Sequence, residues 1–393
     1  MRAGLFMLCL AYVLSQFFRA FLAVLTSVLA QDIGAEPDDL ATASGLWFLS
    51  FALMQLPVGW SLDRIGPRRT ASILLLFGGS GGAALFALAS STFQIKLAML
   101  LIGIGCSPVL MASYYIFAKM YPAAMFSTLA GAMIGFGSLG NLASSAPMAW
   151  AVDAIGWRET MVGLAVATLA VSAALWVFVK DPPKVVASGP RGSVLDILKI
   201  KALWLIFPMM FVNYVPAAGL RGLWVGPYGA DVFGAETSVI GTMTLVMGLA
   251  MIAGNFAYGP LDRLLGTRKW VVFGGNALGA VGCFALYALP MDASIWTATA
   301  LLAVVGFAGA SFAVMIGHAR PFFPEHLTGR GVTLMNLFGI GGVGVMQIVT
   351  GRMMTSWQGA GTDNDAYRQL FGFYGLLICC GLAIYAFSTD RTD

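Results

Sequence analysis

Two arginines lie inside long apolar stretches of this sequence, where a charged side chain is costly. Arg19 stands about 15 residues into the first apolar run, and Arg221 stands about 19 residues into a later one. A guanidinium in hydrocarbon costs several kcal/mol unless it faces a water-filled cavity or a partner. Because the guanidinium is planar and forms paired hydrogen bonds with carboxylate or phosphate groups, the two arginines predict a binding site for an organic anion.

Each arginine follows a tyrosine by seven residues, Tyr12 before Arg19 and Tyr214 before Arg221. In an uninterrupted helix this spacing is two turns and places both side chains on one face. The two tyrosine and arginine pairs are about 202 positions apart. The same offset superposes Pro122, Gly137 and Gly140 on Pro324, Gly339 and Gly342. The sequence therefore predicts an internal repeat in which the two arginines form a symmetric clamp.

The elements that position these residues are membrane-spanning helices. Hydrophobic residues make up 59% of the chain and charged residues only 10%, a composition that excludes a water-soluble protein. A helix that crosses about 30 Å of hydrocarbon needs about 20 apolar residues, and such runs recur about twelve times. The predicted spans are 4–30, 43–62, 71–90, 94–117, 127–151, 160–179, 202–226, 239–260, 270–290, 294–317, 331–350 and 368–387.

The positive charges predict the orientation. If the N-terminus is cytoplasmic, about 16 of the 22 Lys and Arg residues fall in cytoplasmic loops or termini. The positive-inside rule then places both termini in the cytoplasm, which fits a multi-pass protein of the plasma membrane, or of the inner membrane in bacteria. The polar, proline-containing stretch from Lys180 to Lys201 predicts a cytoplasmic linker. We therefore expect an all-α integral membrane protein with an N-terminal bundle at 1–180, a linker at 181–201 and a C-terminal bundle at 202–393.

A charged motif follows the second predicted span. It reads GWSLDRIGPRR and contains Gly59, Asp63, Arg64, Gly66, Arg68 and Arg69. A looser copy, GPLDRLLGTRK, follows the eighth span with Asp262, Arg263 and Arg268, and has one more residue between Asp262 and Gly266. An aspartate at a helix end can accept hydrogen bonds from an arginine and from the start of a neighbouring helix. The motif predicts a conformational latch; the alternative is that its charges serve topology alone.

The first motif resembles the cytoplasmic loop signature of the major facilitator superfamily, G-x-x-x-D-R-x-G-x-R-R. The resemblance implies two pseudo-symmetric bundles of about six helices and alternating access. Arginines on the first and seventh helices further resemble those of the organophosphate:phosphate antiporters and related organic-anion carriers. Only Arg19 and Arg221 carry over from that comparison, because the further motifs of those carriers are not evident here.

Further polar residues lie on helices that line the cavity in this superfamily. Tyr114, Tyr115, Asn213 and Gln55 are candidate substrate contacts, although each could instead bond a neighbouring helix.

All the acidic residues fall in predicted loops or at helix ends. A proton-coupled symporter usually keeps a carboxylate inside the membrane as its proton site. This pattern therefore favours another mode of coupling, either exchange of two anions or transport of a protonatable substrate.

The leading prediction is a secondary transporter of a small organic anion. The alternative is a carrier of a neutral aromatic solute such as a vitamin, with stacking from Trp47, Tyr114, Tyr115, Trp224 and Tyr228. No catalytic constellation lies within the spans, which argues against an enzyme. No cofactor, metal or nucleic acid is expected; the expected partners are the substrate, a counter-anion or proton, and the lipid bilayer, and the protein is expected to be a monomer.

Overall fold

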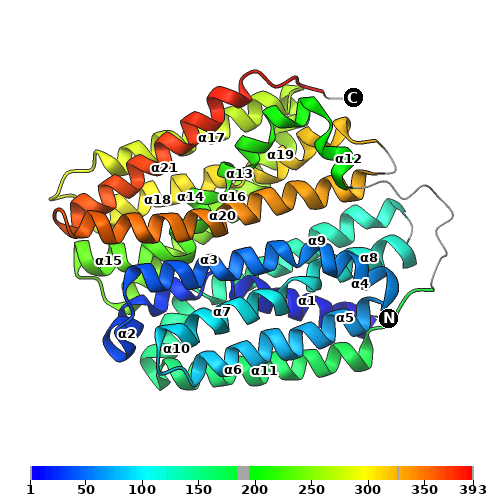
Figure 1. Ribbon diagram of the computed structural model, residues 1–393, viewed down its shortest axis with the longest axis horizontal. Coiled ribbons are helices and arrows are strands. Elements are labelled where there is room, and N and C mark those ends of the chain that lie inside the picture. The colour runs from blue at the N-terminus through cyan, green and yellow to red at the C-terminus, as the bar shows by residue number, and fades with distance from the viewer. Residues whose placement is uncertain (1, 122, 184–193, 325–326, 392–393) are drawn as a thin grey trace. The chain divides into compact units, whose positions relative to one another are not determined.

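The computed structural model describes residues 2–121, 123–183, 194–324 and 327–391. The chain divides into two compact units, Met1–Ser188 and Gly189–Asp393, called unit 1 and unit 2 below. Every element assigned in the described residues is helical (Figure 1). The predicted linker at 181–201 is described only at its two ends, because residues 184–193 lie outside the described part.

Unit 1 contains the helices of the first six predicted spans. Several spans consist of two or three consecutive helices that differ in direction or in winding. The helices are α1 (Arg2–Phe17), α2 (Leu22–Ile33), α3 (Pro37–Leu53), α4 (Gln55–Arg64), α5 (Pro67–Leu74), the π-helix η1 (Leu75–Ser80), α6 (Gly81–Ala87), α7 (Thr92–Cys106), α8 (Pro108–Met120), α9 (Ala123–Ala143), α10 (Ala146–Ile155) and α11 (Trp157–Phe178).

Unit 2 contains the helices of the other six predicted spans, preceded by one short helix, α12. They are α12 (Val194–Leu198), the 3-10 helix η2 (Lys201–Leu205), α13 (Phe207–Asn213), α14 (Val215–Gly219), the π-helix η3 (Leu220–Trp224), α15 (Val225–Phe233), α16 (Thr237–Leu265), α17 (Lys269–Tyr287), α18 (Ile295–Gly309), α19 (Phe312–Ala319), the 3-10 helix η4 (Arg320–Phe322), α20 (Thr328–Gln358) and α21 (Asp363–Tyr385).

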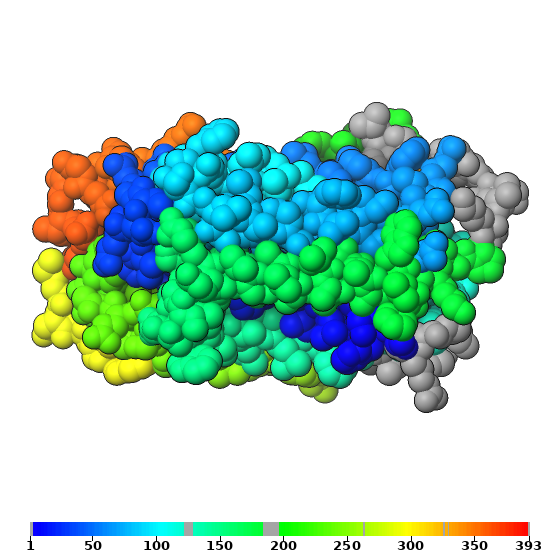
Figure 2. All heavy atoms as spheres, turned by 90° about the horizontal axis from the view of Figure 1, so that it is seen from below, coloured from blue at the N-terminus to red at the C-terminus, as the bar shows by residue number. Residues whose placement is uncertain are grey.

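These helices have the length and composition of membrane spans. Ten of them, some built from consecutive helices, are long and apolar enough to cross a bilayer, and the bent pair α1 and α2 makes an eleventh. The remaining predicted span, 127–151, is formed by α9 and α10. Figure 2 shows α11 running along one face of unit 1. Its side chains Val162, Val166 and Trp176 are exposed, as expected for contact with lipid tails. The protein is a multi-pass, all-α membrane protein.

The first predicted span is interrupted. Helices α1 and α2 meet at an angle of 51°, and the four residues from Phe18 to Phe21 between them are not helical. The Ala20 amide donates to the Phe17 carbonyl at 3.1 Å and the Val24 amide to the Phe21 carbonyl at 3.2 Å, and both are i to i−3 bonds that interrupt the regular i to i−4 ladder. The expectation of one continuous helix over 4–30 was wrong, and Arg19 lies within the break.

The seventh predicted span is also irregular. Pro216, near the start of α14, has no amide hydrogen to donate, and the α-helix is interrupted at Tyr214, between α13 and α14. The π-helix η3 follows and contains Arg221. Single turns of π-helix are uncommon and occur often at functional sites. Both predicted clamp arginines therefore lie where the backbone departs from the α-helix.

Paired close contacts support the internal repeat. In unit 1, Gly103 on α7 lies against the Trp47 carbonyl of α3; in unit 2, Gly306 on α18 lies against the Met247 carbonyl of α16. Glycines also end the first span of each unit in the left-handed conformation, Gly34 with φ 65° and Gly234 with φ 61°. Such equivalent packing is the expected result of building two bundles from one repeated unit.

The repeat does not keep the single offset that the sequence suggested. Gly140 on α9 packs against the Val13 carbonyl, whereas Gly342 on α20 packs against the Phe211 carbonyl. The two glycines follow the predicted offset, but their partners differ from it by about four residues, roughly one helical turn. By this contact, Arg221 lies about one turn further along its span than Arg19 does, so the single offset of 202 that paired the two arginines is not kept.

Candidate functional site

Arg19 lies against two aromatic rings of α3. Its guanidinium carbon is 5.6 Å from the ring centre of Trp47 and 5.6 Å from that of Phe51. These two rings are stacked, with centres 5.2 Å apart and planes 14° apart. Both rings are buried. A cation beside aromatic faces is stabilised by the ring quadrupoles without losing its charge, so the guanidinium is held in place and keeps its hydrogen-bond donors.

Three buried polar atoms near the break lack hydrogen-bond partners among the described residues. They are Arg19 Nε, the indole nitrogen of Trp47 and Gln16 Oε1. Buried polar groups are nearly always bonded to protein or to water, so an unsatisfied group needs a specific explanation. Two donors and one acceptor without partners at or beside a single helix break suit a ligand with an anionic group.

Arg221 is almost completely buried, with 3% of its surface exposed. Its guanidinium packs against Gly248 on α16: a Cβ added at Gly248 would lie 3.0 Å from Arg221 Nε and 3.1 Å from one terminal nitrogen. Gly248 therefore provides the room that the guanidinium occupies. Nearby on the same turn, the Trp224 indole donates to Gln347 Oε1 at 3.0 Å, and Gln347 donates to the Gly219 carbonyl at 3.3 Å.

The two tyrosines do not share a face with their arginines as predicted. The Tyr12 ring packs at Gly137 on α9, whereas the Arg19 guanidinium packs against Trp47 on α3. The centre of the Tyr214 ring is 5.2 Å from that of Phe312 on α19, whereas the Arg221 guanidinium packs against Gly248 on α16. The prediction assumed continuous helices, and the helix breaks direct the members of each pair to different neighbours.

The other candidate contacts of unit 1 fall in three places. Tyr114 on α8 lies near Tyr12, and both interact within unit 1. Gln55 is buried and donates to the Phe51 carbonyl at 3.1 Å, which bridges the junction between α3 and α4. Tyr115 interacts with the Asp63 carboxylate and is therefore part of the latch region.

Asn213 belongs to a buried polar cluster in unit 2. Its amide donates to Asn276 at 2.8 Å and to Ser311 at 2.9 Å. Asn213 ends α13, and Ser311 lies between α18 and α19, so the cluster joins two helix interruptions. This role is the interhelical bond that the sequence allowed as an alternative.

The first motif is organised by an aspartate outside it. The Asp181 carboxylate, just beyond α11, accepts the backbone N–H of Arg68 at 2.8 Å, and the Arg68 side chain lies 3.9 Å away. Gly66 has φ 107°, and a Cβ there would lie 2.8 Å from the same carboxylate. The predicted interaction of an aspartate with a helix start is thus made by Asp181. Gly59 on α4 has open space around it, and the side chains of Asp63, Arg64 and Arg69 are exposed.

Unit 2 repeats this arrangement. The Asp390 carboxylate, beyond α21, accepts the backbone N–H of Lys269 at 3.3 Å and also bonds Thr267. The Arg268 guanidinium donates to the Arg391 carbonyl at 3.3 Å. The side chains of Asp262 and Arg263, which the sequence assigned to the second latch, lie outside the described part. In both units, an aspartate after the last span therefore caps the start of the third span, at α5 in unit 1 and at α17 in unit 2.

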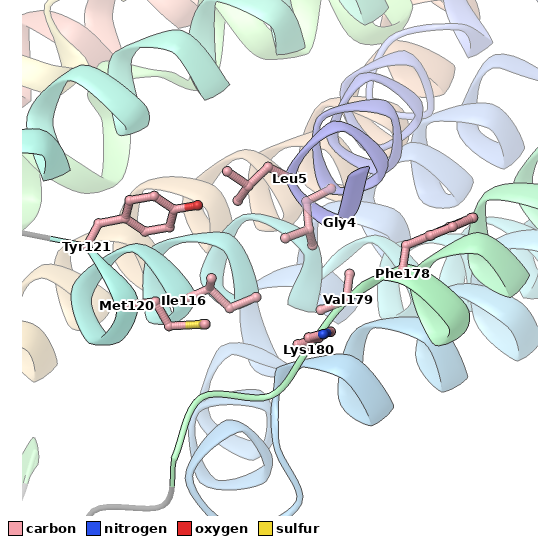
Figure 3. Close-up of a pocket in the computed structure, with 9 residues that line it drawn as sticks. Gly4, Leu5, Ile116, Met120, Tyr121, Phe178, Val179 and Lys180 are labelled. Atoms are coloured by element: carbon pink, nitrogen blue, oxygen red, sulfur yellow. The ribbon is translucent and has the colours of Figure 1, made fainter. Parts of the chain in front are cut away.

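A small cavity lies at the end of unit 1 where the chain begins. It is lined mainly by apolar side chains from α1, α8 and α11, including Leu5, Ile116 and Met120, with Lys180 at the edge (Figure 3). It offers little polar chemistry. In the part of the chain that the structure describes, no group of three or more His, Cys, Asp or Glu side chains could hold a metal ion.

Sequence reasoning missed Gln16, Asp181 and Gly248 as parts of these sites. Gln16 carried a usable signal, since an amide three residues before Arg19 within an apolar run is unusual. Asp181 directly follows Lys180 in the polar linker and showed no pattern of its own. Gly248 was one of 48 glycines, and only its contact with Arg221 distinguishes it.

Comparisons with known proteins agree with the fold. The family model described as Major Facilitator Superfamily matches residues 8–229 and 209–393. Among solved structures, a bacterial homologue of the human lysosomal transporter Spinster, inward-facing and occupied, has a TM-score of 0.78 with 17% identity and covers 98% of this chain and 96% of its own. A D-xylose-proton symporter has a TM-score of 0.79 with 16% identity, covering 100% and 99%. At these identities the likeness shows the fold.

Two relatives are transporters by name. The probable sulfoacetate transporter SauU of Cupriavidus necator is 25% identical over 176 residues, which span 45% of this chain and only 41% of the relative. The sialic acid transporter NanX of Escherichia coli is 22% identical over 291 residues, which span 70% and 68%. Since the family model covers nearly the whole chain, this protein is a membrane transporter, not an enzyme, and belongs to the major facilitator superfamily.

Proposed function

We propose that this transporter carries a small organic anion by alternating access and that Arg19 binds the anionic group. The observation that carries the proposal is the Arg19 guanidinium itself. It lies in a helix break within an apolar span, flanked by two aromatic rings, and its Nε lacks a hydrogen-bond partner among the described residues. A guanidinium held in this way is prepared to bind a carboxylate, sulfonate or phosphate.

The aromatic flank favours a binding role over a purely structural one. A structural arginine in a membrane protein normally pairs with a carboxylate or with helix-end carbonyls. Within the described residues, the Arg19 guanidinium interacts with the Trp47 and Phe51 rings and lies near the Cys106 thiol, and none of these is a carboxylate or a helix-end carbonyl. Cation–π contacts contribute about 0.5–2 kcal/mol and leave the N–H donors unused, so an incoming anion gains hydrogen bonds without displacing another partner.

The names of the two relatives support an anionic substrate. Both sulfoacetate and sialic acid are organic acids, and each name belongs to a protein of the same family. The neutral aromatic alternative has less support, because two of the five aromatic residues it relied on, Tyr228 and Trp224, have partners within unit 2. Tyr228 is enclosed by Phe233, Tyr367 and Phe371, and Trp224 donates to Gln347.

Calorimetric titration with sulfoacetate and with sialic acid tests the proposal. For whichever acid binds, Arg19→Lys keeps the charge but loses the planar fork, so affinity should fall at least about tenfold, or roughly 1.4 kcal/mol. Arg19→Ala should cost more. The matched control is Arg158→Lys, because Arg158 bonds Asp32 and the Ala89 carbonyl away from the break; its affinity should equal that of the wild type. Unchanged anion affinity in Arg19→Ala would rule out the proposal.

Exchange of two anions is the proposed mode of coupling. In the part of the chain that the structure describes, the acidic residues lie in loops or near helix ends, so no carboxylate there lies deep in a span to carry a proton. Proteoliposomes loaded with an unlabelled anion should therefore take up labelled anion without an imposed pH gradient. Uptake that depends strictly on an inward proton gradient would contradict exchange and leave the anion site itself in place.

A further inference from the structure

We infer that Gln16 is a second substrate contact and that the transported anion carries a hydroxyl group a few atoms from its charged group. This inference rests on the proposed function and specifies the class of acid. It starts from Gln16 Oε1, a buried amide oxygen without a hydrogen-bond partner in the described part of the chain. Gln16 as a whole is only 7% exposed.

An unpaired buried amide oxygen is destabilising, because it has lost its hydrogen bonds to water. Such a cost is tolerated where a ligand restores the bond. Gln16 is in the last turn of α1, and Arg19 is three residues later in the break. Because three residues of chain span at most about 10 Å, a ligand of several atoms bound by the Arg19 guanidinium can reach the Gln16 amide.

Packing holds the Gln16 side chain in place. Its Cγ would lie 3.4 Å from a Cβ added at Gly137, so the stem rests against α9 where that helix carries no side chain. The Tyr12 ring rests on the same glycine, one turn earlier along α1. The stem that carries the amide is therefore held against α9, and a restrained polar group discriminates between ligands better than a mobile one.

The chemistry of the amide selects the ligand group. Gln16 Oε1 accepts a hydrogen bond, and the amide nitrogen donates one. A hydroxyl satisfies both, since it donates one hydrogen and accepts with its lone pairs. A second carboxylate on the ligand would place its negative oxygens against the partially negative amide oxygen, which is unfavourable. A site that bonds a substrate hydroxyl discriminates strongly against the analogue without it, because the buried group is again left unpaired.

The test compares acids that differ in their hydroxyl groups. The pairs are gluconate against hexanoate, and 2-hydroxyethanesulfonate against ethanesulfonate. We expect the wild type to bind the hydroxylated member of at least one pair more tightly by at least about tenfold, and Gln16→Leu to lose that preference while still binding the plain acid. The matched control is Gln94→Leu at the start of α7, where the Gln94 side chain accepts the Ser90 amide at 2.7 Å; it should keep the preference.

A second measurement separates binding from a structural role. If Gln16 serves the substrate, Gln16→Leu removes an unsatisfied buried group, so the ligand-free variant should melt at the same temperature as the wild type or higher. A lower melting temperature together with an unchanged ligand preference would overturn the inference.

The outcomes also separate this inference from the proposed function. Equal affinities within both pairs, or a preference that survives in Gln16→Leu, would overturn the hydroxyl contact and leave the anion site at Arg19 standing. Absence of binding for all four acids and for sulfoacetate and sialic acid would remove the proposed function, and the inference with it.

Discussion

The Asp181 carboxylate accepts the backbone N–H of Arg68 at 2.8 Å, although the two residues are 113 positions apart in the chain. The contact ties the end of α11 to the start of α5. A carboxylate at a helix start is favoured by the helix dipole and by the free amide groups there. Since Asp390 and Lys269 make the equivalent contact in unit 2, this bond is a repeated feature of the bundle and places the charged motif.

Asp181→Asn should impair transport more than binding. The amide removes the negative charge that faces the first turn of α5 and the Arg68 side chain, so the position of the motif becomes less defined. Initial uptake into proteoliposomes should fall several-fold while the calorimetric affinity stays within about twofold of the wild type. Asp153→Asn, at an exposed position of α10, is the control. Wild-type uptake by Asp181→Asn would show that the contact does not contribute to the transport cycle.

Asp63→Asn tests the motif itself. Asp63 interacts with Tyr115 on α8, and the sequence motif predicts that its charge affects the balance between conformations. We expect strongly reduced transport with insertion and substrate affinity largely intact. The measurements are uptake, membrane yield and calorimetric affinity. Normal uptake would reduce the motif to a topology signal.

Two glycines of α9 give a matched pair for packing at the site. Alanine favours a helix over glycine by about 0.5–1 kcal/mol, and Gly135 has nothing within 4 Å of the added Cβ. Gly135→Ala should therefore leave the melting temperature unchanged or raise it. At Gly137 the Cβ would overlap the Tyr12 ring, so Gly137→Ala should lower the melting temperature and weaken anion binding. Equal melting temperatures for the two variants would show that Tyr12 moves aside without cost.

Gly248 determines the room available to Arg221. Gly248→Ala places a methyl group 3.0 Å from Arg221 Nε in a fully packed position, so the guanidinium must shift. Uptake should fall several-fold, and Gly274→Ala, with nothing within 4 Å of the added Cβ, should not reduce it. Arg221→Lys separates the two roles open to this residue: weaker binding indicates contact with the anion, whereas altered turnover with unchanged binding indicates a role in gating.

Both termini are expected on the cytoplasmic side. The prediction follows from the excess of Lys and Arg in alternate loops. Cysteine or epitope tags at each end should be modified only after the membrane is permeabilised, while a tag in the loop after Gly34 should react in intact cells. Labelling of the C-terminal tag in intact cells would contradict an even number of spans.

The sequence alone determined the number and approximate limits of most spans, because the thickness of the bilayer sets the length of an apolar run. Arg19, Arg221 and the first charged motif were also visible from the sequence, since charges are rare in these runs and local spacing identifies the motif. The helix break beside Pro216 also had a local signal, because proline lacks an amide hydrogen.

Only the tertiary structure decided what those residues contact. The break from Phe18 to Phe21 contains neither proline nor glycine, and a helix in a membrane can be interrupted where neighbouring helices pack around the freed backbone groups. Asp181, and not Asp63, caps the start of α5 because α11 ends beside it. Arg19 contacts Trp47 and Phe51 because α3 packs beside the break. Such contacts depend on the packing of residues far apart in the chain, which the spacing of residues within one span does not encode.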